Sequence, residues 1–327
     1  MGVFVFLPLV LPLSAWPIAR LAEQHLHPRT ATRLLGAVAG VMAVCSTLCL
    51  ALLMVVGTAQ LPGNPLPDGW SDPEVRAAVP YDEFAGKAAI PALIVVGVAC
   101  SRAILSHFRV RRRSLRALGG LPDSSVAVLN DDVPYAYALP GGLRGGRRGG
   151  RIVVSTGLLG GLQPPERRAL FAHERAHLAA RHHRFLLAAQ LAARANPFLR
   201  PLRTSLTFTT ERWADEDAAR AVRDRTVVAR AIGKAALASG AGSGAGATPA
   251  PTLAGLAAPG PVPRRVAALL APAPTARIRP AMFTGVTGFT GVGLALSCAA
   301  VGTVVSAMSS ANSAVTMVLI LRAATPL

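Results

Sequence analysis

The sequence predicts a mainly α-helical protein in which multi-pass membrane helices are joined to an α+β domain with a small β-sheet. Two observations support this fold class. Of the 327 residues, 52% are apolar and only 5% are aromatic, and the apolar residues gather in long stretches. Between the third and fourth of these stretches, the pattern changes to charged helical segments and short runs rich in β-branched residues. The chain therefore combines a membrane region with a domain outside the bilayer.

Four stretches are apolar enough to cross a bilayer, which takes about 20 residues. They cover 2–19, 34–59, 88–105 and 282–308, and the last of them is extended by the apolar run 314–321. The first stretch has the opposite charge order to a secretory signal, since Arg20 follows its apolar run and no positive charge precedes it. We therefore interpret it as a retained span.

Basic residues flanking the spans predict the orientation in the membrane. The loop 20–33 carries three arginines, the loop 60–87 is slightly acidic, and "HFRVRRRSLR" follows the third span. This pattern places the N-terminus outside and residues 106–280 in the cytoplasm of a multi-pass cell-membrane protein. The segment 108–280 holds 27 of the 34 basic residues against 10 acidic ones. Positive-inside topology thus accounts for most of the net charge of +18, and because the basic residues are dispersed we expect no nucleic-acid binding.

The chain divides into five predicted segments. They are a membrane region with about three spans (1–107), a cytoplasmic domain (108–238), a flexible Gly/Ala/Pro linker (239–263), a basic juxtamembrane helix (264–280) and a C-terminal span with its tail (281–327). Within the cytoplasmic domain, "SVAVLNDDVPYAYALPG" and "RIVVSTGLL" predict short strands separated by a basic hairpin tip. Two long helices are expected to follow, over 164–195 and about 203–238, with Asn196-Pro197 between them.

The motif "HERAH" lies in the first of these two helices. His173 and His177 are four residues apart, so both imidazoles project from one helix face toward one ion. Catalytic zinc takes three protein ligands and keeps one open position for water. Glu174 lies beside that face, placed to take a proton from the metal-bound water rather than to ligate. The alternative is an ordinary charged helix face with histidines among arginines.

The second long helix supplies the missing ligand. Glu211 follows His177 by 34 residues, which leaves room for a turn and an antiparallel return, and two histidines with a glutamate form an established catalytic zinc set. Asp215 shares the face of Glu211 and can accept a hydrogen bond from the far nitrogen of a ligating histidine. The alternative is a solvated acidic patch, which we prefer only for Glu216 and Asp217. We interpret His182 and His183 as surface or packing residues.

Four motifs taken together carry a family resemblance. "YAYALPG", "RIVVSTGLLGGL", "ERRALFAHERAHLAARHH" and "NPFLRPL…ERWADEDAARAV" resemble, in this order over 125–225, the membrane-anchored gluzincin metallopeptidases. That group includes HtpX, the CAAX prenyl protease and the BlaR/MecR-type antirepressor peptidases. The Asn-Pro break, the Glu-Arg opening of the second helix and the four spans favour the last type. The resemblance implies a zincin-like catalytic domain with one Zn²⁺ per chain, bound by His173, His177 and Glu211, with Glu174 as base and Asp215 behind a ligand.

The resemblance also covers a basic stretch and shows two departures. "RRVAALL" resembles a stretch that follows the catalytic helices in these families, which makes Arg265 a candidate oxyanion-stabilising residue, although we prefer lipid-headgroup binding as its role. Tyr135 stands where the HtpX-like group usually has asparagine, so substrate contacts near that strand stay open. About 19 residues follow the last span, too few for a penicillin-binding sensor, and we do not expect β-lactam sensing.

The expected function is hydrolysis of peptide bonds in a protein or peptide substrate by an integral-membrane zinc metalloendopeptidase. The substrate would lie extended beside Tyr135, Ala136, Tyr137 and Ala138, pairing as an added strand. An ordinary sheet edge without a substrate is the alternative. The expected partners are that substrate and the lipid bilayer, and the resemblance suggests a cytoplasmic repressor as one substrate. Two other classes stay open: a catalytically idle, zinc-containing membrane signalling or scaffold protein, and a membrane-tethered nucleic-acid binder.

Overall fold

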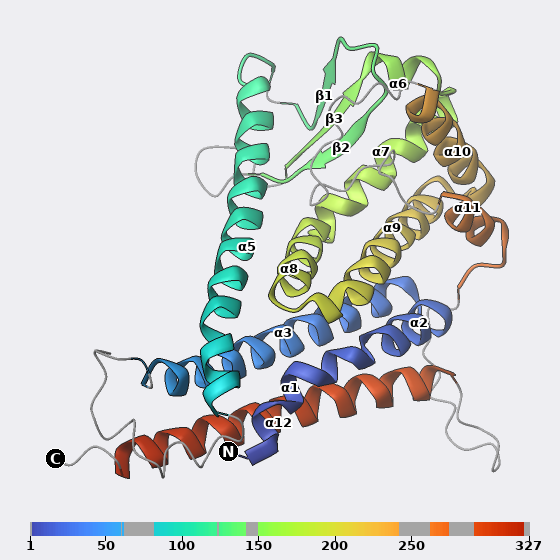
Figure 1. Cartoon of the computed structure of the whole chain (residues 1–327). Coiled ribbons are helices and arrows are strands. Elements are labelled where there is room, and N and C mark those ends of the chain that lie inside the picture. Colours follow the sequence, from blue (N-terminus) through green and yellow to red (C-terminus); the bar gives the residue numbers. More distant parts are fainter. Residues whose placement is uncertain are drawn as a thin grey trace, which may run out of the picture.

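The structure of the chain is a computed structural model that describes residues 2–59, 61, 82–122, 124–141, 150–241, 262–274 and 291–323. Within these residues, helices form most of the molecule and one small sheet lies above them (Figure 1). The predicted fold class is therefore confirmed. Residues 242–261 of the predicted linker 239–263, residues 142–149 of the predicted hairpin tip and most of the loop 60–87 lie outside the described residues.

Three helices in the described part of the chain are long and apolar enough to cross a membrane. They are α3 (Pro28–Ala59), α5 (Asp82–Ala117) and α12 (Gly291–Ala323). Helices α3 and α12 lie side by side, and α5 rises from α3 toward the sheet (Figure 1). At the contact between α3 and α5, a Cβ atom on Gly57 would lie 2.2 Å from the backbone of Gly86, so only glycine allows this approach.

The apolar stretch 2–19, interpreted from the sequence as a retained span, does not form one continuous helix. It folds into η1 (Gly2–Val5), α1 (Leu7–Val10), η2 (Leu11–Ser14) and the first part of α2 (Ala15–His25). Pro8 and Pro12 stand at the starts of α1 and η2. Each proline lacks the N–H that a continuous helix needs and clashes with the preceding turn, which explains the interruptions. The last predicted span begins outside the described residues, and α12 includes its extension 314–321.

The sheet has three strands in the order β1-β3-β2: β1 (Val126–Leu129), β2 (Ala136–Leu139) and β3 (Arg151–Ser155). Strand β1 is parallel to β3 and β2 is antiparallel to it. The Ser155 N–H donates to the Tyr135 carbonyl, and in an antiparallel pair such bonds recur at every second residue. The N–H and C=O groups of Ala136 and Ala138 therefore point away from β3, to an edge where no other described strand pairs.

The helices of the α+β domain are shorter than predicted because two left-handed residues interrupt them. The sequence predicted one helix over 164–195, but Arg181, with φ of 54°, separates α7 (Pro164–Ala179) from α8 (His182–Ala195). Similarly, Arg223, with φ of 58°, ends the second helix early. The remaining elements are α6 (Thr156–Gly160), η4 (Pro197–Leu199), α9 (Arg200–Val222), α10 (Arg225–Ala241) and α11 (Val262–Leu270).

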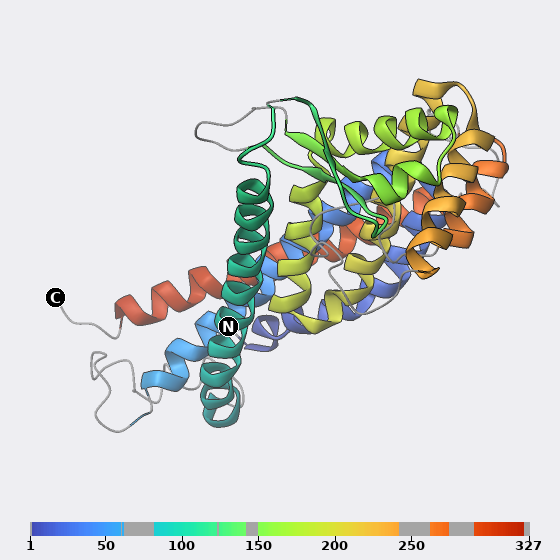
Figure 2. The same ribbon diagram turned by 90° about the horizontal axis from the view of Figure 1, so that it is seen from above.

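Two of the hydrophobic clusters in the described residues position the helices of the domain. One fills the space below the sheet between α7, α10 and α11, where Leu170, Ile232 and Leu269 are buried. The other is shared with the membrane helices, since Leu202 and Leu206 of α9 pack with residues of α2, α3, α8 and α12. Viewed from the front and from above, α5 and the α10–α11 pair stand on opposite sides of the sheet (Figure 1, Figure 2). The helices α7 and α9 are thereby fixed between the sheet and the membrane helices.

Candidate metal centre

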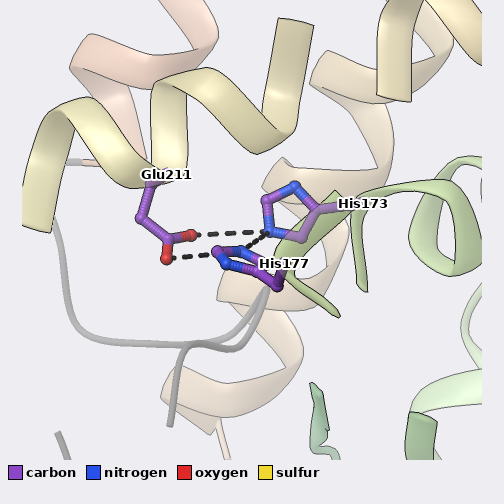
Figure 3. A group of neighbouring side chains, drawn as sticks. All are labelled: His173, His177 and Glu211. Carbon is purple, nitrogen blue, oxygen red and sulfur yellow. Dashed lines mark hydrogen bonds and ion pairs between the residues drawn. The ribbon is translucent and has the colours of Figure 1, made fainter. Parts of the chain in front are cut away.

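Two packed helices bring together the three side chains that the sequence predicted as metal ligands. His173 and His177 come from α7 and Glu211 from α9, and one donor atom of each lies within 4.8 Å of the others. Figure 3 shows the two imidazoles and the carboxylate pointing toward one another. The Glu211 Oε2 atom lies 3.5 Å from His173 Nε2, and its Oε1 atom lies 3.5 Å from His177 Nε2. All three residues are buried.

The start of α7 is fixed by local sequence. Pro164 and Pro165 suit the first turn, where no N–H is required, and Gln163 and Glu166 form a reciprocal capping box. Lys234 of α10 donates to the Glu166 carboxylate at 2.8 Å. From this anchored start, α7 runs beneath the sheet with Ala169 and Leu170 in the core. Its next turn then presents the histidines to α9.

Glu174 is fully buried on the same turn as His173. Burial would lower the pKa of Arg265, but the carboxylates of Asp215, Glu211 and Glu174 outweigh it and raise this pKa. The structure therefore places the predicted base within the same buried group of charges as the predicted ligands.

Asp215 and Arg265 form a buried pair behind the ligands. The Asp215 Oδ1 atom lies 3.1 Å from His173 Nδ1, and Arg265 donates to both Asp215 oxygens, at 2.9 and 2.6 Å. A third donor of Arg265, Nη1, lies 3.1 Å from Glu211 Oε2. Burial opposes ionisation of Asp215, but Arg265 and His173 outweigh it and hold the pKa of this carboxyl well below its usual range.

The position of Arg265 overturns the interpretation that it binds a lipid headgroup. Its side chain is 1% exposed, and α11 packs into the core beneath the sheet. Because its donors face two buried carboxylates, Arg265 neutralises their charge within the protein. The position of Arg265 could not be predicted from the sequence, because the linker between α10 and α11 has no pattern that indicates where α11 packs.

The pKa values of the two histidines of the motif are shifted in opposite directions. Burial alone would lower the pKa of His173, but hydrogen bonds to Asp215 and Glu211 raise it to about 9. Burial lowers the pKa of His177 well below its usual value, and Glu211 offsets this only in part. Asp215 is therefore the partner that distinguishes His173 from His177.

His182 is a buried neighbour of the cluster that the sequence did not predict. Its Nδ1 atom lies 2.8 Å from His177 Nδ1, and its side chain is fully buried against Trp213. Of the two roles predicted for His182, surface or packing, the structure shows packing. Burial lowers its pKa to about 3. His183, by contrast, is half-buried and outside the cluster.

The donor set fits a zinc ion. Two imidazole nitrogens and one carboxylate are the ligands of catalytic zinc sites with an open fourth position. Glu211 Oε2 is buried and makes no hydrogen bond within the described residues, although Arg265 Nη1 lies 3.1 Å away, so this oxygen keeps its acceptor capacity for a metal ion. These residues would hold the ion, and Asp215 would orient one of its ligands.

The predicted edge strand overlies this helix. Ala136 and Ala138 turn their side chains inward, and β2 contacts α7. Tyr135 and Tyr137 are half-buried, with ring centroids 6.2 Å apart. Burial and a hydrogen bond to Asp131 raise the pKa of Tyr135 to about 12, so this phenol stays protonated at neutral pH.

A buried His-His-Glu set below a small sheet, in a chain with membrane-capable helices, is the arrangement expected of a membrane-associated zinc metallopeptidase. Comparison with family models agrees, since residues 109–273, about half of the chain, match the model of Peptidase family M48. The chain belongs to Peptidase family M48, which includes the HtpX, CAAX protease and BlaR-type zinc metallopeptidases, and the resemblance seen in the sequence is confirmed. No curated protein and no solved structure matches the chain.

Proposed function

We propose that this protein is an integral-membrane zinc metalloendopeptidase that cleaves a protein substrate at the cytoplasmic face, with Glu174 as the catalytic base. The observation that carries the proposal is the buried set of His173, His177 and Glu211 with Glu174 on the same helical turn. One zinc ion per chain suits this set, because each of the three residues offers one ligand atom.

In the proposed reaction, different residues of the chain have different roles. Zinc, when bound, would act as a Lewis acid that lowers the pKa of a water molecule and polarises the scissile carbonyl. Glu174 takes the proton of the attacking water and returns it to the leaving amine. Asp215 holds the His173 ring through Nδ1, and Arg265 balances the charge of Asp215 and Glu211. Since the donors of Arg265 already face carboxylates, its contacts favour this positioning role over stabilisation of an oxyanion.

The edge of β2 that pairs with no other described strand suits an extended substrate. The backbone groups of Ala136 and Ala138 point to the open side, and a peptide could pair there as a fourth strand. Such pairing recognises the peptide backbone more than its side chains. A cytoplasmic repressor is the substrate that the BlaR/MecR-type resemblance suggests.

Two features support a cytoplasmic position for the site. The segment 20–33, which carries three arginines and joins α2 to α3, packs against α9: Thr32 donates to Thr209, and Ser205 donates to Glu23. These contacts support a position of segment 20–33 and the site on the same side of the membrane. The arginines at the end of α5 favour the cytoplasm for the same side.

The test is zinc content and casein cleavage by the detergent-purified protein. We expect about one zinc per chain in the wild type, and loss of both zinc and cleavage in His177→Ala and Glu211→Ala. Glu174→Gln should keep the zinc and lose cleavage by at least about 100-fold, since general base catalysis contributes about 10²–10⁴. Arg175→Gln, an exposed change on the same helix, should behave like the wild type.

Other outcomes would favour the other classes of protein. If the wild type binds zinc, and Glu174→Gln cleaves as slowly as the wild type, the protein is an idle zinc-containing scaffold. If the wild type binds no zinc, "HERAH" is an ordinary charged helix face. DNA binding that weakens steeply with salt would revive the nucleic-acid alternative.

A further inference from the structure

The two histidines of the metal centre have the same orientation but different partners behind them. In both rings Nε2 faces the cluster, where the two Nε2 atoms lie 3.0 Å apart, and Nδ1 faces away. Behind His173 lies the carboxylate of Asp215, at 3.1 Å. Behind His177 lies the Nδ1 atom of His182, at 2.8 Å. His182 therefore occupies, for His177, the place that Asp215 occupies for His173.

Zinc binding fixes where the protons of this histidine pair lie. A nitrogen that ligates a metal carries no proton, so a neutral His177 bound through Nε2 has its proton on Nδ1. The His177 Nδ1–H group must then donate a hydrogen bond to His182 Nδ1, because two N–H groups cannot face each other at 2.8 Å. This leaves His182 neutral with its own proton on Nε2. Full burial of the His182 ring favours this uncharged form.

The ring of His182 is held in place by Trp213. The two rings meet at a centroid distance of 4.6 Å with an interplanar angle of 63°. The Trp213 indole N–H donates to Asp217 at 3.1 Å, which fixes the orientation of the indole. The guanidinium groups of Arg29 and Arg33 lie 5.4 and 5.5 Å from the centre of the Trp213 ring. Both arginines belong to the first two turns of the membrane helix α3.

We infer that His182 is a positioning residue that orients the zinc ligand His177, and that Trp213 connects it to the beginning of α3. The inference rests on the proposed function, since it requires His177 to be a zinc ligand. It assigns a role in ligand orientation to a residue five positions beyond His177, on the next helix. A contiguous series of side chains then links the membrane helix to the metal centre.

The test compares three variants of the full-length protein in detergent. His182→Phe keeps an aromatic ring against Trp213 but removes the acceptor, whereas His182→Asn keeps an acceptor close to the position of Nδ1. His183→Phe is the matched control, because His183 is the adjacent histidine but lies outside the cluster. The readouts are the zinc dissociation constant, measured by competition with a chelator, and the visible absorption of the Co²⁺-loaded protein.

We expect His182→Phe to weaken zinc binding by about 10–100-fold, which is typical for loss of a group behind a ligand. The Co²⁺ absorption should change in the same variant, since the His177 ring is no longer held. His182→Asn should recover most of the affinity, and His183→Phe should match the wild type. Wild-type affinity and an unchanged Co²⁺ spectrum in His182→Phe would overturn the inference. So would equal losses in His182→Phe and His182→Asn with thermal unfolding of the zinc-free proteins unchanged.

The link to α3 is tested by the double variant Arg29→Gln/Arg33→Gln. We expect a zinc dissociation constant between those of the wild type and His182→Phe, and a wild-type value would overturn this link. Failure of the proposed function looks different, because the wild type itself would then bind no zinc or cleave no casein. Loss of helical circular dichroism in His182→Phe alone, with wild-type affinity in His182→Asn, would show a packing role and overturn the positioning role.

Discussion

At the scale of single residues, the metal centre is a compact arrangement of buried charges. Glu174, Glu211 and Asp215 are three acids with almost no exposed surface, and Arg265 is a cation among them. Burying an unpaired charge is costly, so each of these groups depends on its neighbours for its ionised state. Arg265 is therefore as much a part of the site as the ligands.

Replacement of Arg265 tests this dependence. We expect Arg265→Ala to destabilise the zinc-free protein by about 3–5 kcal/mol, because Asp215 and Glu211 keep their burial and lose their counter-charge. Thermal unfolding in detergent, followed by circular dichroism, measures the effect. Arg264→Ala is the matched control: Arg264 is exposed, and its removal should cost less than about 1 kcal/mol. Equal melting temperatures of the two variants would contradict the proposed role.

The residue scale also shows what a linear pattern can predict. His173, His177 and Glu211 were identified because helical spacing places the first two on one face and an acid on a returning helix meets them. His182 was missed because, on a continuous helix, a residue five positions after His177 points to another side. The left-handed Arg181 ends α7 and starts α8 in a new direction, which turns His182 back toward the site. No feature of the local sequence around Arg181 predicts this turn.

At the scale of elements, the first turn of α7 determines where the site is built. The Glu166 carboxylate accepts the backbone N–H of Gln163 at 2.7 Å and pairs with Lys234. Burial would raise the pKa of Glu166, but these two contacts outweigh it and lower the pKa below its usual value of 4.5. The pair thus joins the start of α7 to α10.

The lowered pKa of Glu166 predicts a pH-dependent contribution to stability. A carboxyl with a lower pKa in the folded state stabilises the protein fully above pH 4.5, and the contribution is lost as the pH falls through the lowered pKa. Glu166→Gln keeps the hydrogen-bond acceptor but loses the charge, so we expect a cost of about 1 kcal/mol at pH 7. The difference in melting temperature between wild type and variant should shrink below pH 4.5. A difference of the same size at pH 3.5 and pH 7 would contradict this assignment.

At the scale of the whole molecule, the membrane helices and the α+β domain are not independent bodies. Leu199, Leu202 and Leu206 are fully buried in a core that includes Leu35 and Met42 of α3. Each such leucine contributes about 1.5–3 kcal/mol through burial of apolar surface. The helix that carries Glu211 is therefore packed directly on a membrane helix.

This shared core predicts that the catalytic segment does not fold in isolation. We expect a fragment of residues 108–274 to aggregate in buffer without detergent, because the faces of α8 and α9 that contact α3 become exposed. Size-exclusion chromatography with and without detergent measures this, and the full-length chain in detergent is the control. A monodisperse fragment that binds zinc in plain buffer would contradict the prediction.

The sequence predicted the strands, the membrane-capable helices and the ligand set, because each depends on a periodicity or a spacing of a few residues. It could not predict that α9 packs on α3, or that α11 places Arg265 beneath the sheet. Both depend on contacts between segments far apart in the chain. The stretch 2–19 shows a third limit, since its apolar composition indicated a span while its prolines divided it into short helices.

The edge of β2, which pairs with no strand among the described residues, has a consequence for which proteins such an enzyme would not cleave. A strand that offers only the N–H and C=O groups of Ala136 and Ala138 requires a partner segment whose own backbone groups are unpaired. A natively folded neighbour has already satisfied nearly all of these groups internally. Under the proposed function, a folded protein would therefore resist cleavage. Cleavage would begin in segments that are locally unfolded or lie at the ends of the folded region.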